Sequence, residues 1–112
     1  MSDLSSQQCK VCEGGVSPLT QQESEKYLNR LASNWQLSDD GKSISRTFTF
    51  KNYYETMAFS NVVAMVAHQQ DHHPEMTITY KTCHVEYSTH SIKGLSENDF
   101  ICAAKIDKTL SL

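Results

Sequence analysis

The feature that most constrains the fold of this chain is a strict alternation of side-chain types in residues 43–50. Its alternating positions hold Ile44, Arg46, Phe48 and Phe50, with serine or threonine between them. Successive side chains of a β-strand point to opposite faces, so the pattern predicts a strand with one buried face. The alternation recurs at residues 76–80 and 83–87, which predicts two further strands, and Tyr80 is expected in the core.

Helical patterns separate and flank these strands. Thr20 and Glu23 fit a capping box, and the helix that they open is expected to run to about Ser33. A second helix is expected to open at Asn52 and to end before Pro74. Its predicted buried stripe comprises Tyr54, Met57, Ala58, Val62, Met65 and Val66. A third helix is expected after Ser96, with its apolar positions at Phe100, Ala103, Ala104 and Leu110.

The resulting order of elements is α-β-β-α-β-β-α. Trp35 and Leu37 begin a short first strand, and residues 39–42 form a turn typical of a hairpin. Two hairpins separated by a helix predict a single α+β domain, in which helices pack on one face of a four-stranded antiparallel sheet. The domain is expected to span residues 18–112. Residues 1–17, rich in Ser, Gln and Gly, are expected to be a flexible arm.

Composition narrows the classes of function. Ten Lys and Arg residues against thirteen Asp and Glu argue against a broad nucleic-acid interface, which is usually basic. The longest apolar run, Val62 to Ala67, is much shorter than the roughly 20 residues of a membrane span. Residues 2–10 are too polar for a signal peptide, so a cytoplasmic protein is expected.

The four cysteines allow two interpretations. Cys9 and Cys12 form a Cys-x-x-Cys pair without a second such pair, whereas structural zinc sites normally have four ligands. Reduced thiols in the arm are therefore expected, with a zinc or redox role as the alternative. Cys83 and Cys102 fall in predicted regular elements, where a free cysteine behaves as a small apolar residue.

All five histidines lie between His68 and His90. His72 and His73 are placed where Pro74 ends the helix, and His90 follows the last strand. Both positions belong to the same edge of the second hairpin, so these three rings are expected to converge. Imidazole titrates near neutrality and can serve as both acid and base, which favours proton-transfer catalysis. A metal site using His68 and His72, or histidines with a merely structural or surface role, are the alternatives.

The run from His68 to Asp99 resembles the signature of the pterin-4a-carbinolamine dehydratases. The matching residues are His68, His72-His73-Pro74, Tyr80, His90 and Asp99, separated by three, five, nine and eight residues. The likeness covers roughly residues 18–110, and the predicted order of elements also resembles the family fold. The resemblance implies a dehydratase that converts a 4a-hydroxytetrahydropterin, released by an aromatic amino-acid hydroxylase, into quinonoid dihydropterin and water.

The resemblance also implies roles for individual residues. His72, His73 and His90 would supply acid and base without a metal or other cofactor. Backbone groups of residues 71–73 and 88–90 would contact the polar edge of the pterin. These two ranges contain Asp71, Ser88 and Thr89 in addition to the three histidines. A homodimer or homotetramer is expected, without direct nucleic-acid or membrane contact. The alternative that the resemblance offers is a binding role, as a dimerisation cofactor of a transcription factor.

Four further positions carry specific expectations. Asp99 is expected to cap the third helix and could also orient His90 from behind. His68 is assigned a similar orienting role, although many relatives carry Glu there. Met76 stands where the family often has Trp, so an aromatic wall beside the pterin is either missing or comes from elsewhere. His84 is expected in solvent or at an oligomer contact.

Overall fold

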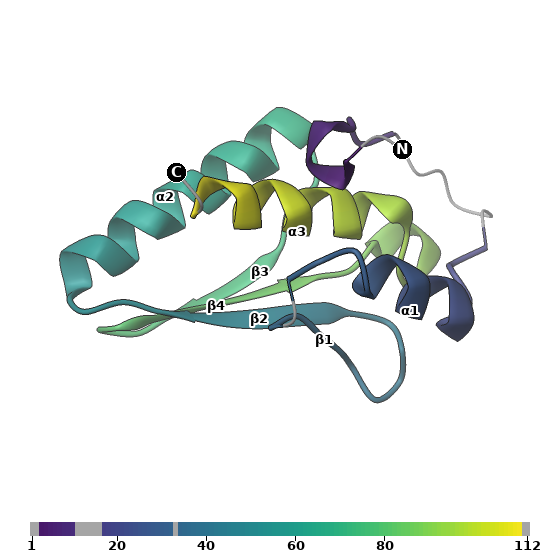
Figure 1. Ribbon diagram of the computed structural model, residues 1–112, viewed down its shortest axis with the longest axis horizontal. Coiled ribbons are helices and arrows are strands. Elements are labelled where there is room, and N and C mark those ends of the chain that lie inside the picture. Colours follow the sequence, from purple (N-terminus) through teal and green to yellow (C-terminus); the bar gives the residue numbers. More distant parts are fainter. Residues whose placement is uncertain (1–2, 11–16, 33, 111–112) are drawn as a thin grey trace.

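The computed structural model describes residues 3–10, 17–32 and 34–110. Its helices are α1 (Gln21–Leu28), α2 (Tyr53–Gln70) and α3 (Glu97–Thr109), with short 3₁₀ helices η1 (Leu4–Ser6) and η2 (His90–Ile92). Its strands are β1 (Gln36–Leu37), β2 (Ile44–Thr49), β3 (Glu75–Ile78) and β4 (Thr82–Tyr87). The antiparallel strands lie in the order β1-β2-β4-β3, and the three α-helices cover one face of the sheet (Figure 1). The predicted α+β architecture is confirmed.

The central pair of strands joins the two hairpins. Phe48 of β2 lies opposite Cys83 of β4, and Ile44 lies opposite Tyr87. All four side chains are buried, because the alternation turns every second residue of both strands towards the helices. The pairing of β2 with β4 carries the end of the second hairpin across the sheet, which places residues 88–90 beside the start of α3.

Helix α1 begins as predicted and ends sooner. Thr20 Oγ1 accepts the N–H of Glu23 at 3.2 Å, and the Glu23 carboxylate accepts the N–H of Thr20 at 2.9 Å. The helix ends at Leu28, because the next N–H groups, of Arg30 and Leu31, bond to carbonyls only three residues back. Ser33, the predicted end, lies outside the described residues.

The predicted buried stripe of α2 is wrong at most of its positions. Tyr54 is 83% exposed and Met65 53% exposed, and only Val66 of the predicted six is fully buried. The residues that α2 buries are instead Thr56, Phe59, Ser60, Val63, Val66 and Ala67. Apolar residues occur around most of this helix, so periodicity did not identify the inner face. The sheet identifies it, since Phe59 packs against Phe48 with ring centroids 4.5 Å apart.

Tyr80 is also placed differently from the prediction. Strand β3 ends at Ile78, and Tyr80 lies in the turn that Thr79 and Thr82 close with a backbone hydrogen bond of 2.9 Å. Its side chain is 63% exposed and stacks on Tyr53, at a centroid distance of 6.0 Å. The alternation of apolar and polar residues continues in the sequence to Tyr80, two residues beyond the end of β3, so it predicted too long a strand.

Substitutions on the two sides of α2 should differ in their effect on stability. Val63→Ala is expected to lower the free energy of unfolding by about 1.5–3 kcal/mol, because Val63 is fully buried. Asn61→Ala on the exposed side should change it by less than about 0.5 kcal/mol. Urea unfolding of both variants measures the difference, and equal effects would contradict the inner face described above.

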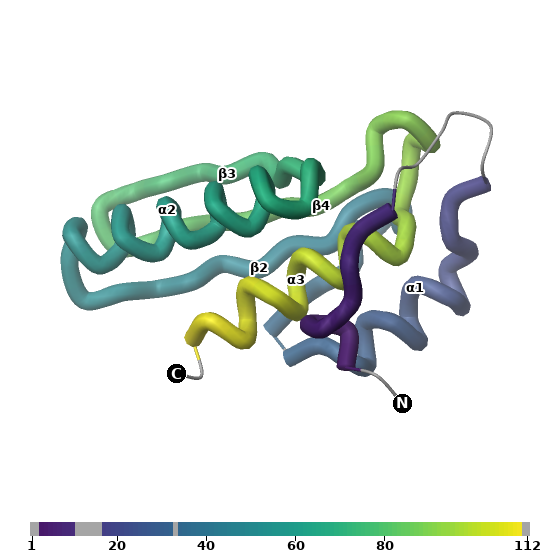
Figure 2. The backbone as a smooth tube through the Cα atoms, turned by 90° about the horizontal axis from the view of Figure 1, so that it is seen from above, coloured from purple at the N-terminus to yellow at the C-terminus, as the bar shows by residue number. Residues whose placement is uncertain are grey.

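Part of the predicted arm lies against the domain in this structure. Residues 3–10 run over α3, on the side away from the sheet (Figures 1 and 2), and Leu4 is only 2% exposed among core residues. The domain boundary at residue 18 and the flexibility of the arm remain predictions, and residues 11–16 lie outside the described part. None of the helices in the described ranges is both long and apolar enough to cross a membrane.

Candidate active site

The predicted corner between helix and strand is formed by the end of α2. Asp71 adopts the left-handed conformation with φ 51° and caps the helix, and its N–H bonds to carbonyls of the last turn. The His72 N–H still reaches the carbonyl of Ala67, at 3.1 Å. Pro74 then directs the chain into β3. His72 and His73 therefore leave the helix together at the edge of the sheet.

The chain that follows β4 forms the opposite side of this corner. Thr89 pairs with Gly94, whose carbonyl accepts the Thr89 N–H at 2.8 Å, and His90 begins the short helix η2 between them. Gly94 is required by packing, since a Cβ there would lie 2.7 Å from the Pro18 Cβ. This tight loop holds His90 beside the residues that follow α2.

These two segments enclose a cavity of about 470 Å³, within the usual size of small-molecule sites. It is lined by all six residues assigned to substrate from the sequence, namely Asp71, His72, His73, Ser88, Thr89 and His90. The sequence reasoning missed the other lining residues, Cys9, Lys10, Gln69, Gln70, Ser91 and Asn98. Gln69, Gln70 and Ser91 adjoin the predicted residues, whereas no spacing in the sequence connects Cys9 or Lys10 with them.

His72 is held by a buried carboxylate. Its Nε2 lies 2.5 Å from Asp99 Oδ1, and Asp99 is fully buried at the start of α3. The other carboxylate oxygen accepts the Thr89 hydroxyl at 2.8 Å and the Ser96 N–H at 2.9 Å. The predicted helix cap is confirmed by the last of these bonds. The orienting contact falls on His72 and not on His90, because α3 begins beneath the end of α2.

The environment of His72 favours its protonated form. Burial by itself would lower the pKa of His72, but the hydrogen bond and negative charge of Asp99 outweigh it and raise the pKa above 6.5. The ring also stacks on Tyr87, with planes 8° apart and centroids 5.6 Å apart. This imidazole is therefore fixed from two sides, while His73 and His90 are exposed at the cavity.

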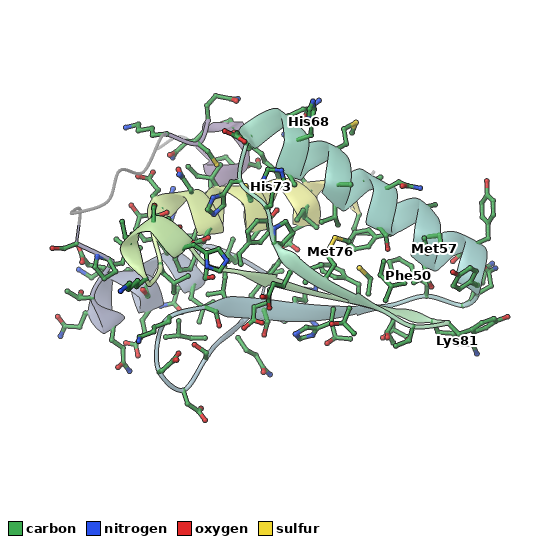
Figure 3. The ribbon with its side chains drawn as sticks, turned by 180° about the vertical axis from the view of Figure 1, so that it is seen from behind. Phe50, Met57, His68, His73, Met76 and Lys81 are labelled. Carbon is green, nitrogen blue, oxygen red and sulfur yellow. The ribbon has the colours of Figure 1, made fainter. Side chains whose placement is uncertain are left out.

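The remaining histidines lie apart from the cavity. His68 is exposed on the outer side of α2, away from His73 (Figure 3), and it does not line the cavity. The helix ends before His72, so His68 and His72 do not share a helical face, which removes the geometric basis for a metal site or an orienting role through this pair. Within residues 3–10, 17–32 and 34–110, no three His, Cys, Asp or Glu side chains are grouped to hold a metal. His84 Nδ1 lies 2.7 Å from Thr47 Oγ1 on the sheet.

The contact between His72 and Asp99 gives a prediction for pH dependence. Because the folded-state pKa of His72 lies above 6.5, the pair should stabilise the fold fully below pH 6.5 and lose this effect as pH rises through the folded-state pKa. NMR titration of the His72 ring should show the raised pKa, and Asp99→Asn should lower it. A His72 pKa at or below 6.5 in the wild-type protein would contradict the expectation.

A small α+β domain with three imidazoles at one cavity has the features of an acid–base enzyme. The sequence model of the family described as pterin 4 alpha carbinolamine dehydratase matches residues 17–109. The chain belongs to this family, and the resemblance seen in the sequence is confirmed. The family and the names of its relatives support pterin dehydratase activity.

The relatives cover almost the whole chain. A protein of Nitrosomonas eutropha, provisionally named a pterin-4-alpha-carbinolamine dehydratase, is 61% identical over 108 residues, which are 96% of this chain and 94% of that protein. A similarly named protein of Legionella pneumophila strain Lens is 48% identical over 109 residues, 97% of this chain and 96% of that protein.

A solved structure supports the same assignment. The crystal structure of a transcriptional coactivator/pterin dehydratase from Brucella melitensis has a TM-score of 0.77 and 34% sequence identity, covering 82% of this chain and 97% of that one. The fold is shared more widely, with a TM-score of 0.58 and 18% identity to a pterin dehydratase-like RuBisCO assembly factor of the alpha-carboxysome. That likeness covers 67% of this chain and 87% of the other chain.

Proposed function

We propose that this protein eliminates water from a 4a-hydroxytetrahydropterin by histidine acid–base catalysis. The observation that carries the proposal is the position of His72, His73 and His90 around one cavity of a size suited to a bicyclic ligand. Family membership supports the substrate class, and the cavity supports the type of chemistry.

The reaction needs one proton delivered and one removed. The C4a–O bond breaks as the hydroxyl gains a proton and leaves as water. The N5–H bond breaks as a base takes its proton, and the electrons of that bond form the C4a=N5 double bond of the quinonoid dihydropterin. No net electron transfer occurs, so a proton donor and a proton acceptor on either side of the ring suffice.

The environments of the imidazoles support a division of these roles. His72, whose pKa Asp99 raises, is the proton donor to the leaving hydroxyl. Asp99 holds Nε2 of that ring, so His72 would act through Nδ1. His73 and His90 are exposed to the cavity, and one of them accepts the N5 proton. The backbone of residues 71–73 and 88–90 would bind the polar edge of the pterin.

A stopped-flow assay tests this function. A 4a-hydroxytetrahydropterin is generated in place, and its dehydration is followed by absorbance with and without the purified protein. We expect the protein to accelerate the reaction well beyond its spontaneous rate, in proportion to protein concentration. A rate equal to that of the protein-free control would reject the proposal.

Two further parts of the proposal concern partners. The substrate would be supplied by an aromatic amino-acid hydroxylase, as part of tetrahydrobiopterin recycling in the cytoplasm. Self-association into a homodimer or homotetramer is supported by large apolar side chains exposed along α2, Tyr53, Tyr54 and Met65. Light scattering during size-exclusion chromatography measures the mass, and a monomer would reject this part. Nothing in the described residues specifically favours the transcription-factor role.

A further inference from the structure

The cavity has a wall that comes from the N-terminal segment. Cys9 and Lys10 line it together with Gln70 and Asn98. Gln70 lies 61 positions after Cys9 in the chain, and Asn98 lies 88 positions after Lys10. The family is recognised from residue 17 onwards, so this wall lies outside the part that defines the family. The alignment with the Nitrosomonas eutropha protein spans 108 residues and therefore includes most of this segment as well.

Two side chains next to the His72 corner hold the wall in place. Gln70, the last residue of α2, accepts the Cys9 N–H at 2.9 Å and donates to the side-chain carbonyl of Gln8 at 3.0 Å. Asn98, in the first turn of α3, accepts the Lys10 N–H at 2.9 Å and donates to the Lys10 carbonyl at 2.5 Å. These side-chain amides provide hydrogen-bond partners for backbone N–H and carbonyl groups of the segment, as the backbone of a neighbouring β-strand would.

The segment is also anchored away from the cavity. Leu4 is only 2% exposed and belongs to the hydrophobic core, and Lys105 Nζ donates to the Ser5 carbonyl at 2.9 Å. Figures 1 and 2 show the segment running from this anchor over α3. Neither Leu4 nor Lys105 lines the cavity, so the wall can be displaced by a change that touches no substrate-binding residue.

The wall also contacts helix α3, which carries the carboxylate that holds His72. Cys9 Sγ lies 3.5 Å from the Sγ of Cys102, a fully buried residue of α3. The contact with Cys102 lowers the pKa of the Cys9 thiol, burial opposes this effect, and the charge of His72 lowers the pKa further. Helix α3 also carries Asp99, the carboxylate that holds His72.

We propose that Cys9 and Lys10 form a positioning wall of the catalytic cavity, held by Gln70 and Asn98, which confines the pterin against the His72 side. Gln70 and Asn98 are then positioning residues that act through this segment. A wall of this kind reduces the number of poses available to the bound ligand, so its loss should weaken binding more than it slows chemistry. The identity of the ligand rests on the proposed function, whereas the placement of the wall does not.

The test displaces the segment of the full-length protein from its remote anchor. Leu4→Asp places a charge in the core position, and Leu4→Met, which keeps an apolar side chain of similar volume, is the matched control. Alkylation of Cys9 by iodoacetamide, read by peptide mass spectrometry after tryptic cleavage at Lys10, reports docking. Cys83, which is fully buried, is the reference for intact folding.

The second readout concerns the ligand. Equilibrium binding of 7,8-dihydrobiopterin and the KM and kcat for dehydration are measured on the same samples. Leu4→Asp should raise Cys9 alkylation, and raise KM and the Kd of the dihydropterin about tenfold, with kcat changed less than about twofold. Leu4→Met should match the wild type. Cys83 should stay protected throughout.

Two results would overturn the proposal. Equal alkylation of Cys9 in the wild type and Leu4→Asp would show that the segment does not dock. Faster alkylation with unchanged KM and Kd would show that it docks without forming a wall. If Leu4→Asp exposes Cys83, Lys105→Ala, which removes the other remote anchor, replaces it, with Lys26→Ala on the exposed side of α1 as control. Absence of dehydratase activity in every sample would reject the proposed function and leave the alkylation result to decide the placement of the segment.

Discussion

Replacing His72, His73 or His90 by alanine, one at a time, is expected to slow catalysed dehydration by about 10²–10⁴-fold, the usual contribution of an acid or base catalyst. His72→Ala should also remove the fall of kcat on the alkaline side, because the ring held by Asp99 is the proposed proton donor and acts only while it is protonated. The measurement is stopped-flow dehydration across pH, with circular dichroism to confirm that each variant is folded.

Two histidines outside the cavity provide matched controls. His68 is exposed on α2 and His84 lies on the sheet beside Thr47. Alanine at either position should leave kcat within about twofold of the wild type, since neither ring can reach the pterin. If the three cavity variants retain the wild-type rate while folded, or if the controls lose as much activity, the proposed mechanism is wrong.

Asp99→Ala is expected to lower the free energy of unfolding by about 3–5 kcal/mol, since it removes one partner of a buried charged pair. The substitution leaves His72 Nε2, the Thr89 hydroxyl and the Ser96 N–H without the carboxylate that joins them. The loss should be larger at pH 6 than at pH 9, because the pair contributes most while His72 is protonated.

Asp39→Ala is the control for this effect. Asp39 is exposed in the turn between β1 and β2, and its replacement should change stability by less than about 0.5 kcal/mol. Urea unfolding at the two pH values measures both variants. A loss for Asp99→Ala no larger than that for Asp39→Ala would show that the carboxylate is not a structural centre of the site.

The part of the site that lies close together in the sequence could be predicted. Pro74 cannot continue a helix, and its position directly after His72 and His73 requires those residues to leave α2 at the sheet edge. The alternation in β4 fixes where that strand ends and therefore where His90 lies. Local backbone chemistry decides both features, so no knowledge of distant contacts was needed.

Features decided by distant packing could not be predicted. The inner face of α2 depends on Phe48 and Phe50 of the sheet, because apolar residues lie on more than one side of that helix. Asp99 could be identified as a helix cap because it follows Ser96 by three positions in the sequence. That its carboxylate binds His72 and not His90 depends on where α3 begins beneath α2.

The sequence by itself determined the order of elements, the antiparallel α+β architecture and the three imidazoles of the cavity, because hydrophobic periodicity, capping and proline act over a few residues. Only the tertiary structure decided which carboxylate holds which ring and that Cys9 and Lys10 line the same cavity. Those contacts join residues 27 to 93 positions apart, and side-chain contacts at such separations leave no periodic pattern in the sequence.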